Sequence, residues 1–338
     1  MKHMLNTLYV LTPESYLSLQ NETIAVKVGG KEKIRVPSHT LSSIYCFGNT
    51  TVSTPLIGFC GDRGISLVFF SEYGKFYGRI QGPVSGNILL RRMQFAAVED
   101  PVQAVRYARS ILLGKIINSK LYLQRVKRER SGHDREFEDA ISKVTSIAAE
   151  LQECPTIERM RGLEGAAASA YFAAMPFMLT VNEFTFSGRN RRPPEDPVNA
   201  ILSFLYTLLK NDVQSALEGV GLDPAAGFLH SMRPGRPALA LDLMEELRSP
   251  MCDRLAIALI NRGQITLKSF EQLQAPVLLN EAGRKTILNA WQKRKQETIK
   301  HPFTNETIPI GLIPHVQAML LARALRGELD EYPPFVWR

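Results

Sequence analysis

The chain has 338 residues, of which 45% are hydrophobic, so it is long and apolar enough to bury a substantial core in one large domain or two. Its 41 Lys and Arg residues outnumber its 33 Asp and Glu residues, and the net charge of +8 favours a polyanionic partner such as nucleic acid. Four scattered cysteines exclude a zinc or disulfide framework, and the lack of a signal pattern or a long unbroken apolar run predicts a cytoplasmic protein without a membrane span.

The first 82 residues alternate short strand-like runs with turn signals. Runs at 5–11, 23–28, 33–37 and 64–70 are rich in β-branched and aromatic residues, and glycine-containing turns separate them. This spacing predicts a small β-sandwich with one helix near residues 54–61. Residues 81–87 read as a linker because they contain Gly, Pro and Ser.

From residue 88 to about residue 327 the pattern is helical. Strands followed by a long run of helices predict an α+β protein with two domains, a β-sandwich at 1–82 and a larger all-α domain at 83–338. The segment 331–338 contains two prolines and cannot form a regular helix. We expect it to dock on the helical domain or on a partner.

Glu164 is a charged residue on the predicted apolar face of a helix. The same face carries Ile157, Met160, Ala167, Ala168, Tyr171 and Met175. A buried carboxylate without a partner is costly, so such a group is paired, protonated or bound to a metal. A salt bridge to Arg161 or Arg189 is the ordinary explanation, and a metal site requires further ligands.

A second helix is predicted to begin with Asp196 as N-cap and Pro197 at its first position. Asn199, Ser203 and Tyr206 form a polar line along one of its faces. Such a line often just faces solvent. The functional alternative is a hydrogen-bonding strip that orients Glu164 or a phosphate, with the hydroxyl of Tyr171 as a further contributor.

His230 lies just before a short loop that leads into a predicted helix carrying Asp242 and Glu245. The two acids are three residues apart, so they share a face and could converge on one ion. Alone, a His is usually structural and such an acid pair usually faces water. With Glu164 they form an oxygen-rich set with one imidazole, which suits Mn²⁺ or Mg²⁺ better than Zn²⁺ and indicates phosphoryl transfer on nucleic acid.

Three basic stretches in the predicted helical domain favour contacts with DNA phosphates. They are residues 115–130, a loop with Arg189, Arg191 and Arg192, and residues 283–301 with Lys293 and Arg294 beside Trp291. A single basic helix is usually an ordinary solvated face, but three in one basic protein indicate a nucleic-acid surface. None contains a base-reading motif, so we expect recognition of backbone and shape.

Four segments together resemble the CRISPR adaptation integrase family, the CRISPR-associated endonuclease of spacer acquisition. They are LEGAAASAYF (163–172), RPPEDPVNAILSFLYTLL (192–209), GLDPAAGFLH (221–230) and ALALDLMEELR (238–248). The order and spacing agree over nearly the whole chain. The stretch from residue 300 to residue 335 resembles the type I-C branch.

The resemblance implies a metal site of Glu164, His230 and an acid of the Asp242/Glu245 pair. In many members the last ligand is Asp, whereas Glu245 stands here, so we expect Glu245 to bind the ion and Asp242 to lie beside it. The resemblance also implies a homodimer formed through the β-domain and a small companion adaptation protein that bridges two dimers. The assembly would insert short duplex DNA into the CRISPR array by attack of 3′-hydroxyls on repeat phosphates.

Two other functions remain compatible with these residues. A branched-DNA repair nuclease would use the same metal with water as the nucleophile. A non-catalytic DNA-binding scaffold would keep Glu164 in a plain salt bridge.

Overall fold

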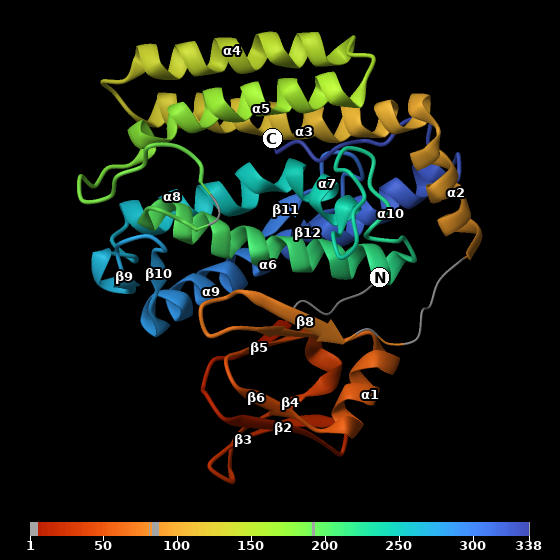
Figure 1. Ribbon diagram of the computed structural model, residues 1–338, viewed down its shortest axis with the longest axis vertical. Helices are drawn as coiled ribbons and strands as arrows, with labels where there is room; N and C mark the ends of the chain where they lie inside the picture. The colour runs from red at the N-terminus through yellow and green to blue at the C-terminus, as the bar shows by residue number, and fades with distance from the viewer. Residues whose placement is uncertain (1–5, 81, 83–87, 191–192, 338) are drawn as a thin grey trace.

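The N-terminal part of the protein consists of strands and the remainder of helices (Figure 1). A computed structural model describes residues 6–80, 82, 88–190 and 193–337, so the predicted linker lies outside the described residues except for Gly82. The strands are β1 (Asn6–Val10), β2 (Ser15–Gln20), β3 (Thr23–Val28), β4 (Lys31–Pro37), β5 (Leu41–Phe47), β6 (Thr50–Val52), β7 (Ser66–Phe70) and β8 (Phe76–Ile80). Strands followed by helices confirm the predicted α+β class.

The strands form two four-stranded sheets, ordered β1-β5-β7-β8 and β4-β3-β2-β6. Residues from both sheets, among them Leu17, Ile24, Ile44 and Leu67, share one buried core between them. Helix α1 (Thr54–Arg63) adds Leu56 to that core. The structure therefore contains the predicted sandwich with one helix.

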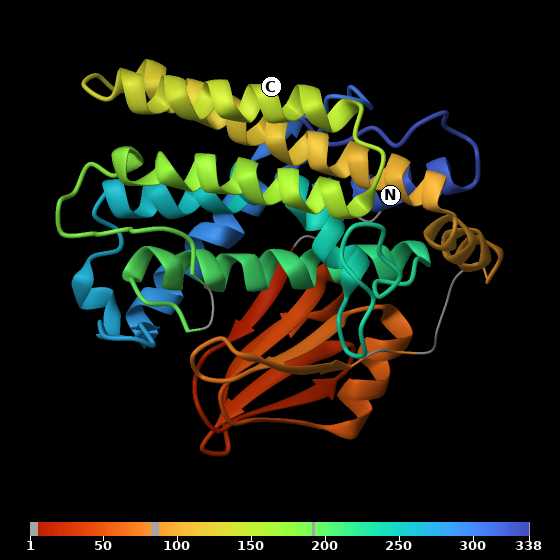
Figure 2. The same ribbon diagram turned by 45° about the horizontal axis from the view of Figure 1, so that its top comes forward.

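The sheet β1-β5-β7-β8 is covered on both faces. Side chains alternate along a strand, and in β5 Ile44 and Cys46 point into the sandwich whereas Tyr45 and Phe47 join the core of the helical part. Both views place helix α6 (Pro197–Val220) along this second face (Figures 1 and 2). One of its residues, Asp212, accepts a hydrogen bond from the Tyr45 hydroxyl at 2.8 Å and binds the Lys295 ammonium at 2.9 Å.

Long helices build the rest of the molecule. Besides α6 they are α2 (Ile88–Glu99), α3 (Pro101–Glu129), α4 (Asp134–Gln152), α5 (Ile157–Ala173), α7 (Ala238–Leu247), α8 (Arg254–Asn261), α9 (Glu281–Gln296) and α10 (Ile313–Leu325). Helices α3, α4 and α5 pack against one another on the side away from the strands (Figures 1 and 2). Helix α3 also packs against α7, which brings α3, α5 and α7 to one place.

The predicted start of α6 is confirmed. Asp196 is its N-cap and accepts a hydrogen bond from the Asn199 amide at 2.8 Å, with Pro197 in the first turn. Helix α3 begins the same way, at Asp100 and Pro101. These starts follow from local chemistry, which is why the sequence predicts them well.

The C-terminal part is not entirely helical, which corrects the expected all-α domain. It contains two short hairpins, formed by β9 (Phe270–Gln272) with β10 (Leu278–Leu279) and by β11 (Thr298–Lys300) with β12 (Thr307–Pro309). Pro276, Pro302 and Pro309 lie within or at the ends of these hairpins, where proline lacks the amide donor that a helix requires.

The tail at 332–337 docks on the helical part, one of the two expected alternatives. Phe335 and Tyr332 are buried, and Glu246 of α7 accepts hydrogen bonds from the Phe335 amide, at 2.7 Å, and from the Tyr332 hydroxyl. Asn118 of α3 donates to the Phe335 carbonyl and accepts from the Trp337 amide, both at 2.7 Å. Burial raises the pKa of Glu246 to about 7, although the hydrogen bonds from Tyr332 and Phe335 act to lower it.

All four cysteines are free and buried, as the scattered spacing predicts. None of the helices in the described part of the chain has the length and apolar character needed to cross a bilayer.

Candidate active site

Two glutamates and a lysine meet where α5, α7 and α3 approach one another. The Lys115 ammonium contacts Oε1 of Glu164 and lies 2.7 Å from Oε2 of Glu245. The Glu245 side chain is 3% exposed and that of Glu164 is 27% exposed, so the pair faces solvent on one side only. Glu164 is therefore paired with a basic residue, although not with one of the expected arginines, because Arg161 donates to the Leu229 carbonyl instead.

Glu245 has two cationic partners. Its Oε1 lies 2.9 Å from the Arg248 guanidinium, and its buried Oε2 contacts Lys115 without accepting a well-directed hydrogen bond. Burial alone would raise the pKa of Glu245, but the charges of Arg248, Lys115 and His230 lower it to about 2. Glu245 is therefore ionised at neutral pH.

Asp242 fixes the position of His230. Its buried carboxylate accepts hydrogen bonds from the amides of Phe228, Leu229 and His230 at 2.6, 3.0 and 2.9 Å, and its Oδ1 lies 2.7 Å from His230 Nδ1. This arrangement uses both oxygens of Asp242, and among the described residues Nε2 of His230 has no hydrogen-bond partner. Gly227 permits the close approach, because a Cβ there would lie 2.7 Å from Asp242 Oδ2.

The donor set fits a hard divalent ion in its chemistry. The carboxylates of Glu164 and Glu245 already share one cation, the Lys115 ammonium. Asp242, one helical turn before Glu245 on α7, orients the imidazole of His230. Over the described ranges, no three His, Cys, Asp or Glu side chains are grouped closely enough to hold an ion as they stand. The lysine therefore occupies the position between the acids that an ion would compete for.

Tyr171 and Tyr206 line the same small cavity as Lys115 and Glu245, with a volume of about 20 Å³. Their hydroxyls donate to Asp253 at 3.0 and 2.6 Å, not to Glu164. Burial raises the pKa of the Asp253 carboxyl, and the two hydroxyls oppose that shift. The tyrosines thus build the wall of the site through Asp253.

Asn199 and Arg189 hold a loop instead of orienting Glu164. The Asn199 side chain accepts from Arg189 at 2.7 Å and donates to the Gly188 carbonyl at 2.8 Å. Arg189 also donates to Ser203 and lies over the Tyr206 ring, 5.2 Å from its centroid, so its charge is engaged within the protein. The predicted DNA contacts Arg191 and Arg192 lie outside the described residues.

The basic stretch at 283–301 offers fewer free charges than its composition indicates. Trp291 is fully buried, and the buried Lys295 binds Asp212. Arg294 pairs with Glu297 and lies over the Trp337 ring, whereas Lys293 is exposed as expected.

The sequence does not place Lys115, Arg248 or Asp253 in this site, and it assigns Lys115 instead to the basic stretch 115–130. Lys115 carries the same signal as Glu164, because it is a charged residue on the buried stripe of a helix. Arg248 stands three residues after Glu245, where a helical pair is expected. Asp253 gives no such signal, since it lies in a π-helical turn, Arg248–Asp253, that periodicity does not predict.

Comparison with known proteins identifies the family of the chain. The model of a family described as CRISPR associated protein Cas1 matches residues 8–293. The CRISPR-associated endonuclease Cas1 1 of Chlorobaculum tepidum is 47% identical over 343 residues, with 100% of both chains covered.

Two solved structures share the fold. A casposase bound to integration product has a TM-score of 0.85 at 20% identity, and the match covers 98% of this chain and 94% of the casposase. A chain of a Cas6-RT-Cas1–Cas2 complex has a TM-score of 0.84 at 23% identity, and the match covers 100% of this chain but 36% of that longer one. On the family match and the curated relative, the chain belongs to the Cas1 family of CRISPR-associated proteins.

Proposed function

We propose that this chain is a Cas1 endonuclease and integrase that joins short duplex DNA to CRISPR repeats. The observation that carries the proposal is the convergence of Glu164 and Glu245 on one cation, beside a histidine that Asp242 holds in place. The name of the Chlorobaculum tepidum relative, an endonuclease, supports the activity, and the casposase with its integration product supports strand transfer.

Glu164, His230 and Glu245 would hold Mg²⁺ or Mn²⁺, and the ion would supply Lewis-acid stabilisation of phosphate charge. Glu245 suits this role better than Asp242, because its Oε2 accepts no directed hydrogen bond whereas amides and His230 use both oxygens of Asp242. Arg248 keeps Glu245 ionised, and Asp242 fixes the tautomer and orientation of His230.

The reaction is a transesterification. The 3′-oxygen of the incoming strand forms a bond to a repeat phosphorus and the 3′-oxygen of the cut strand leaves, so the proton lost by one hydroxyl is gained by the other. The Lys115 ammonium lies among the acids of the site, where it offsets negative charge on the approaching phosphate.

The proposed assembly has three further parts. Two copies form a homodimer through the sandwich, and a small companion of the Cas2 kind bridges two dimers, as the Cas1–Cas2 complex among the structural relatives suggests. We assign the chain to the type I-C branch on the residues at 300–303 and 332–335, and to the cytoplasm, where its DNA is found.

The deciding experiment uses a labelled branched DNA that mimics a half-integrated product, incubated with Mn²⁺. Wild type should rejoin the target strand and release the flap, and Glu164→Ala should lower that rate by about 10²-fold or more. Glu158→Ala, an exposed acid in the first turn of the same helix, should retain the wild-type rate. Strand transfer by Glu164→Ala at the wild-type rate would refute the assignment.

The same assay separates the two alternatives. Hydrolysed fragments without rejoining would identify a branched-DNA nuclease. Folded protein that binds DNA without reaction would indicate a scaffold, and calorimetric Mn²⁺ binding that is lost in His230→Ala would count against that scaffold.

A further inference from the structure

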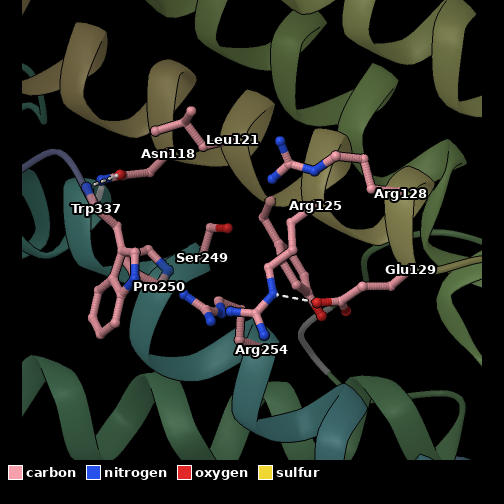
Figure 3. Close-up of a pocket in the computed structure, with 10 residues that line it drawn as sticks. Asn118, Leu121, Arg125, Arg128, Glu129, Ser249, Pro250, Arg254 and Trp337 are labelled. Atoms are coloured by element: carbon pink, nitrogen blue, oxygen red, sulfur yellow. Dashed lines mark hydrogen bonds and ion pairs between the residues drawn. The ribbon is translucent and has the colours of Figure 1, made fainter.

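A cavity of about 370 Å³, larger than the one lined by Lys115 and Glu245, opens beside Ser249 and Arg254 (Figure 3). Its walls are the second half of α3, the turn Arg248–Asp253, the start of α8 and the docked tail. Ser249 lines both this cavity and the small one that holds Lys115 and Glu245. Ser249 is therefore a wall that the two cavities share.

The cavity has an excess of positive charge. Arg125, Arg128 and Arg254 line it together with one acid, Glu129, and Figure 3 shows these side chains around the same space. Arg125 pairs with Glu129 at 2.7 Å. Formally, three positive charges and one negative charge leave a surplus of two.

Arg254, like the exposed Arg128, has no carboxylate partner among the described residues. It lies over the Tyr122 and Trp337 rings, 5.8 and 4.9 Å from their centroids, and no acid of the described chain comes within ion-pair distance of it. Burial and the neighbouring charges of Arg125 and Arg294 lower its pKa to about 10. A desolvated guanidinium that faces other guanidiniums is stabilised most directly by an anion.

Specific contacts of the C-terminal tail fix one wall of this pocket. Asn118 accepts a hydrogen bond from the Trp337 amide, which sets the Trp337 ring against Arg254. Arg294 of α9 contacts the same ring, 4.9 Å from its centroid. Two arginines from different helices are thus held in place by one aromatic side chain.

We propose that this pocket binds a phosphate group of a DNA strand, with Arg254 as the central contact, and that the strand continues past Ser249 into the candidate site. The proposal rests on the proposed function, which supplies DNA as the substrate. Guanidinium groups favour phosphate because their planar forks donate paired hydrogen bonds. The pocket is also large enough for more than the phosphate alone.

The test measures binding of a fluorescent single-stranded oligothymidylate in EDTA, so that neither a metal nor catalysis contributes. Arg254→Gln should weaken binding about tenfold and lower the slope of log affinity against log salt, because a phosphate contact is lost. Arg92→Gln, an exposed arginine on α2 away from the pocket, should bind as wild type does. Wild-type affinity in Arg254→Gln would overturn the proposal.

Two further measurements guard against misfolding and against binding elsewhere. Arg125 is half exposed, so Arg125→Gln should fold normally and weaken binding in the same direction. Iodide quenching reports on Trp337, because the only other tryptophan, Trp291, is fully buried. Saturating oligonucleotide should reduce iodide quenching, and unchanged quenching would place the strand outside the pocket and overturn the proposal.

These experiments can reject the pocket proposal and the proposed function independently of each other. Normal binding by Arg254→Gln with active wild type would reject the pocket and leave the function standing. Arg254-dependent binding by a wild type that fails to rejoin branched DNA would support the pocket and reject the integrase.

Discussion

Lys115 carries a positive charge between two acids of the candidate site. Its ammonium is shared by Glu164 and Glu245, which come from different helices, so one lysine neutralises a position where three elements meet. An ion bound by the same oxygens would have to compete with this lysine or push it aside. We therefore expect Lys115 to stabilise the protein without metal and to lower its affinity for a metal ion.

The Lys115→Met variant tests this competition. Without metal, its free energy of unfolding should be lower than that of wild type by up to about 3 kcal/mol. This is the low end for a broken buried pair, because Arg248 still neutralises Glu245. Added Mn²⁺ should raise its melting temperature more than that of wild type, since the oxygens are no longer occupied by the ammonium. Thermal shift with and without Mn²⁺ measures both effects.

The matched control is Lys120→Met, one and a half turns further along α3, which should respond to Mn²⁺ as wild type does. An equal Mn²⁺ shift in Lys115→Met and wild type would show that the ion and the lysine do not share the two glutamates.

At the scale of elements, the tail acts as a brace for α7. The carboxylate of Glu246 is buried and depends on the tail for the donors Tyr332 and Phe335. The preceding residue, Glu245, faces the candidate site. The tail thereby stabilises the helix on which Asp242 and Glu245 are placed.

Phe335→Ala should lower the free energy of unfolding by about 3–4 kcal/mol, because a fully buried phenyl ring is removed from a packed core. The partly buried neighbour provides the comparison, and Val336→Ala should cost about 1 kcal/mol. Urea denaturation followed by circular dichroism measures both. Equal, small losses would mean that the tail is held only by its polar contacts.

The sequence predicts elements best where local chemistry sets them. The sandwich and the start of α6 follow from β-branched runs and from an Asp-Pro cap. Glu164 stands out because a charge interrupts an apolar stripe. The hairpins at 270–279 and 298–309 and the π-helical turn that carries Asp253 depend on tertiary packing, so periodicity does not predict them.

The same limit applies to side-chain partners. The sequence brings Glu164, His230 and Glu245 into one hypothesis, but it does not indicate which cation lies between them. It also assigns Arg189 and Arg294 to DNA, but it does not indicate the aromatic and polar partners that both have within the fold. Partners that are distant in sequence require the packed structure.

At the scale of the whole molecule, the sandwich and the helical part share a continuous interface. Tyr45 and Phe70 of the sheet belong to the same buried core as Phe204 of α6. Asp212 joins the sheet to α9 as well, through Tyr45 and Lys295. We therefore expect the two parts to unfold together instead of as separate domains.

Asp212→Ala should lower the free energy of unfolding by about 3 kcal/mol, because it leaves the buried Lys295 ammonium without its partner. Asp62→Ala, an exposed acid of α1, should change it little. Calorimetry should give one transition for wild type. Two transitions, with only one shifted by Asp212→Ala, would contradict a shared core.

The contact between Asn118 and Phe335 can form only near the end of protein synthesis. The two residues are 217 positions apart, which corresponds to roughly 10–40 s of synthesis at the ribosome. Helix α3 is completed early in that interval and α7 later, and Asn118 and Glu246 lack the partners that residues 332–337 provide until the interval ends. The candidate site therefore reaches its final form late, and a ribosome that stalls between residues 246 and 332 leaves a chain that carries every proposed metal ligand but lacks the contacts of the tail with α7.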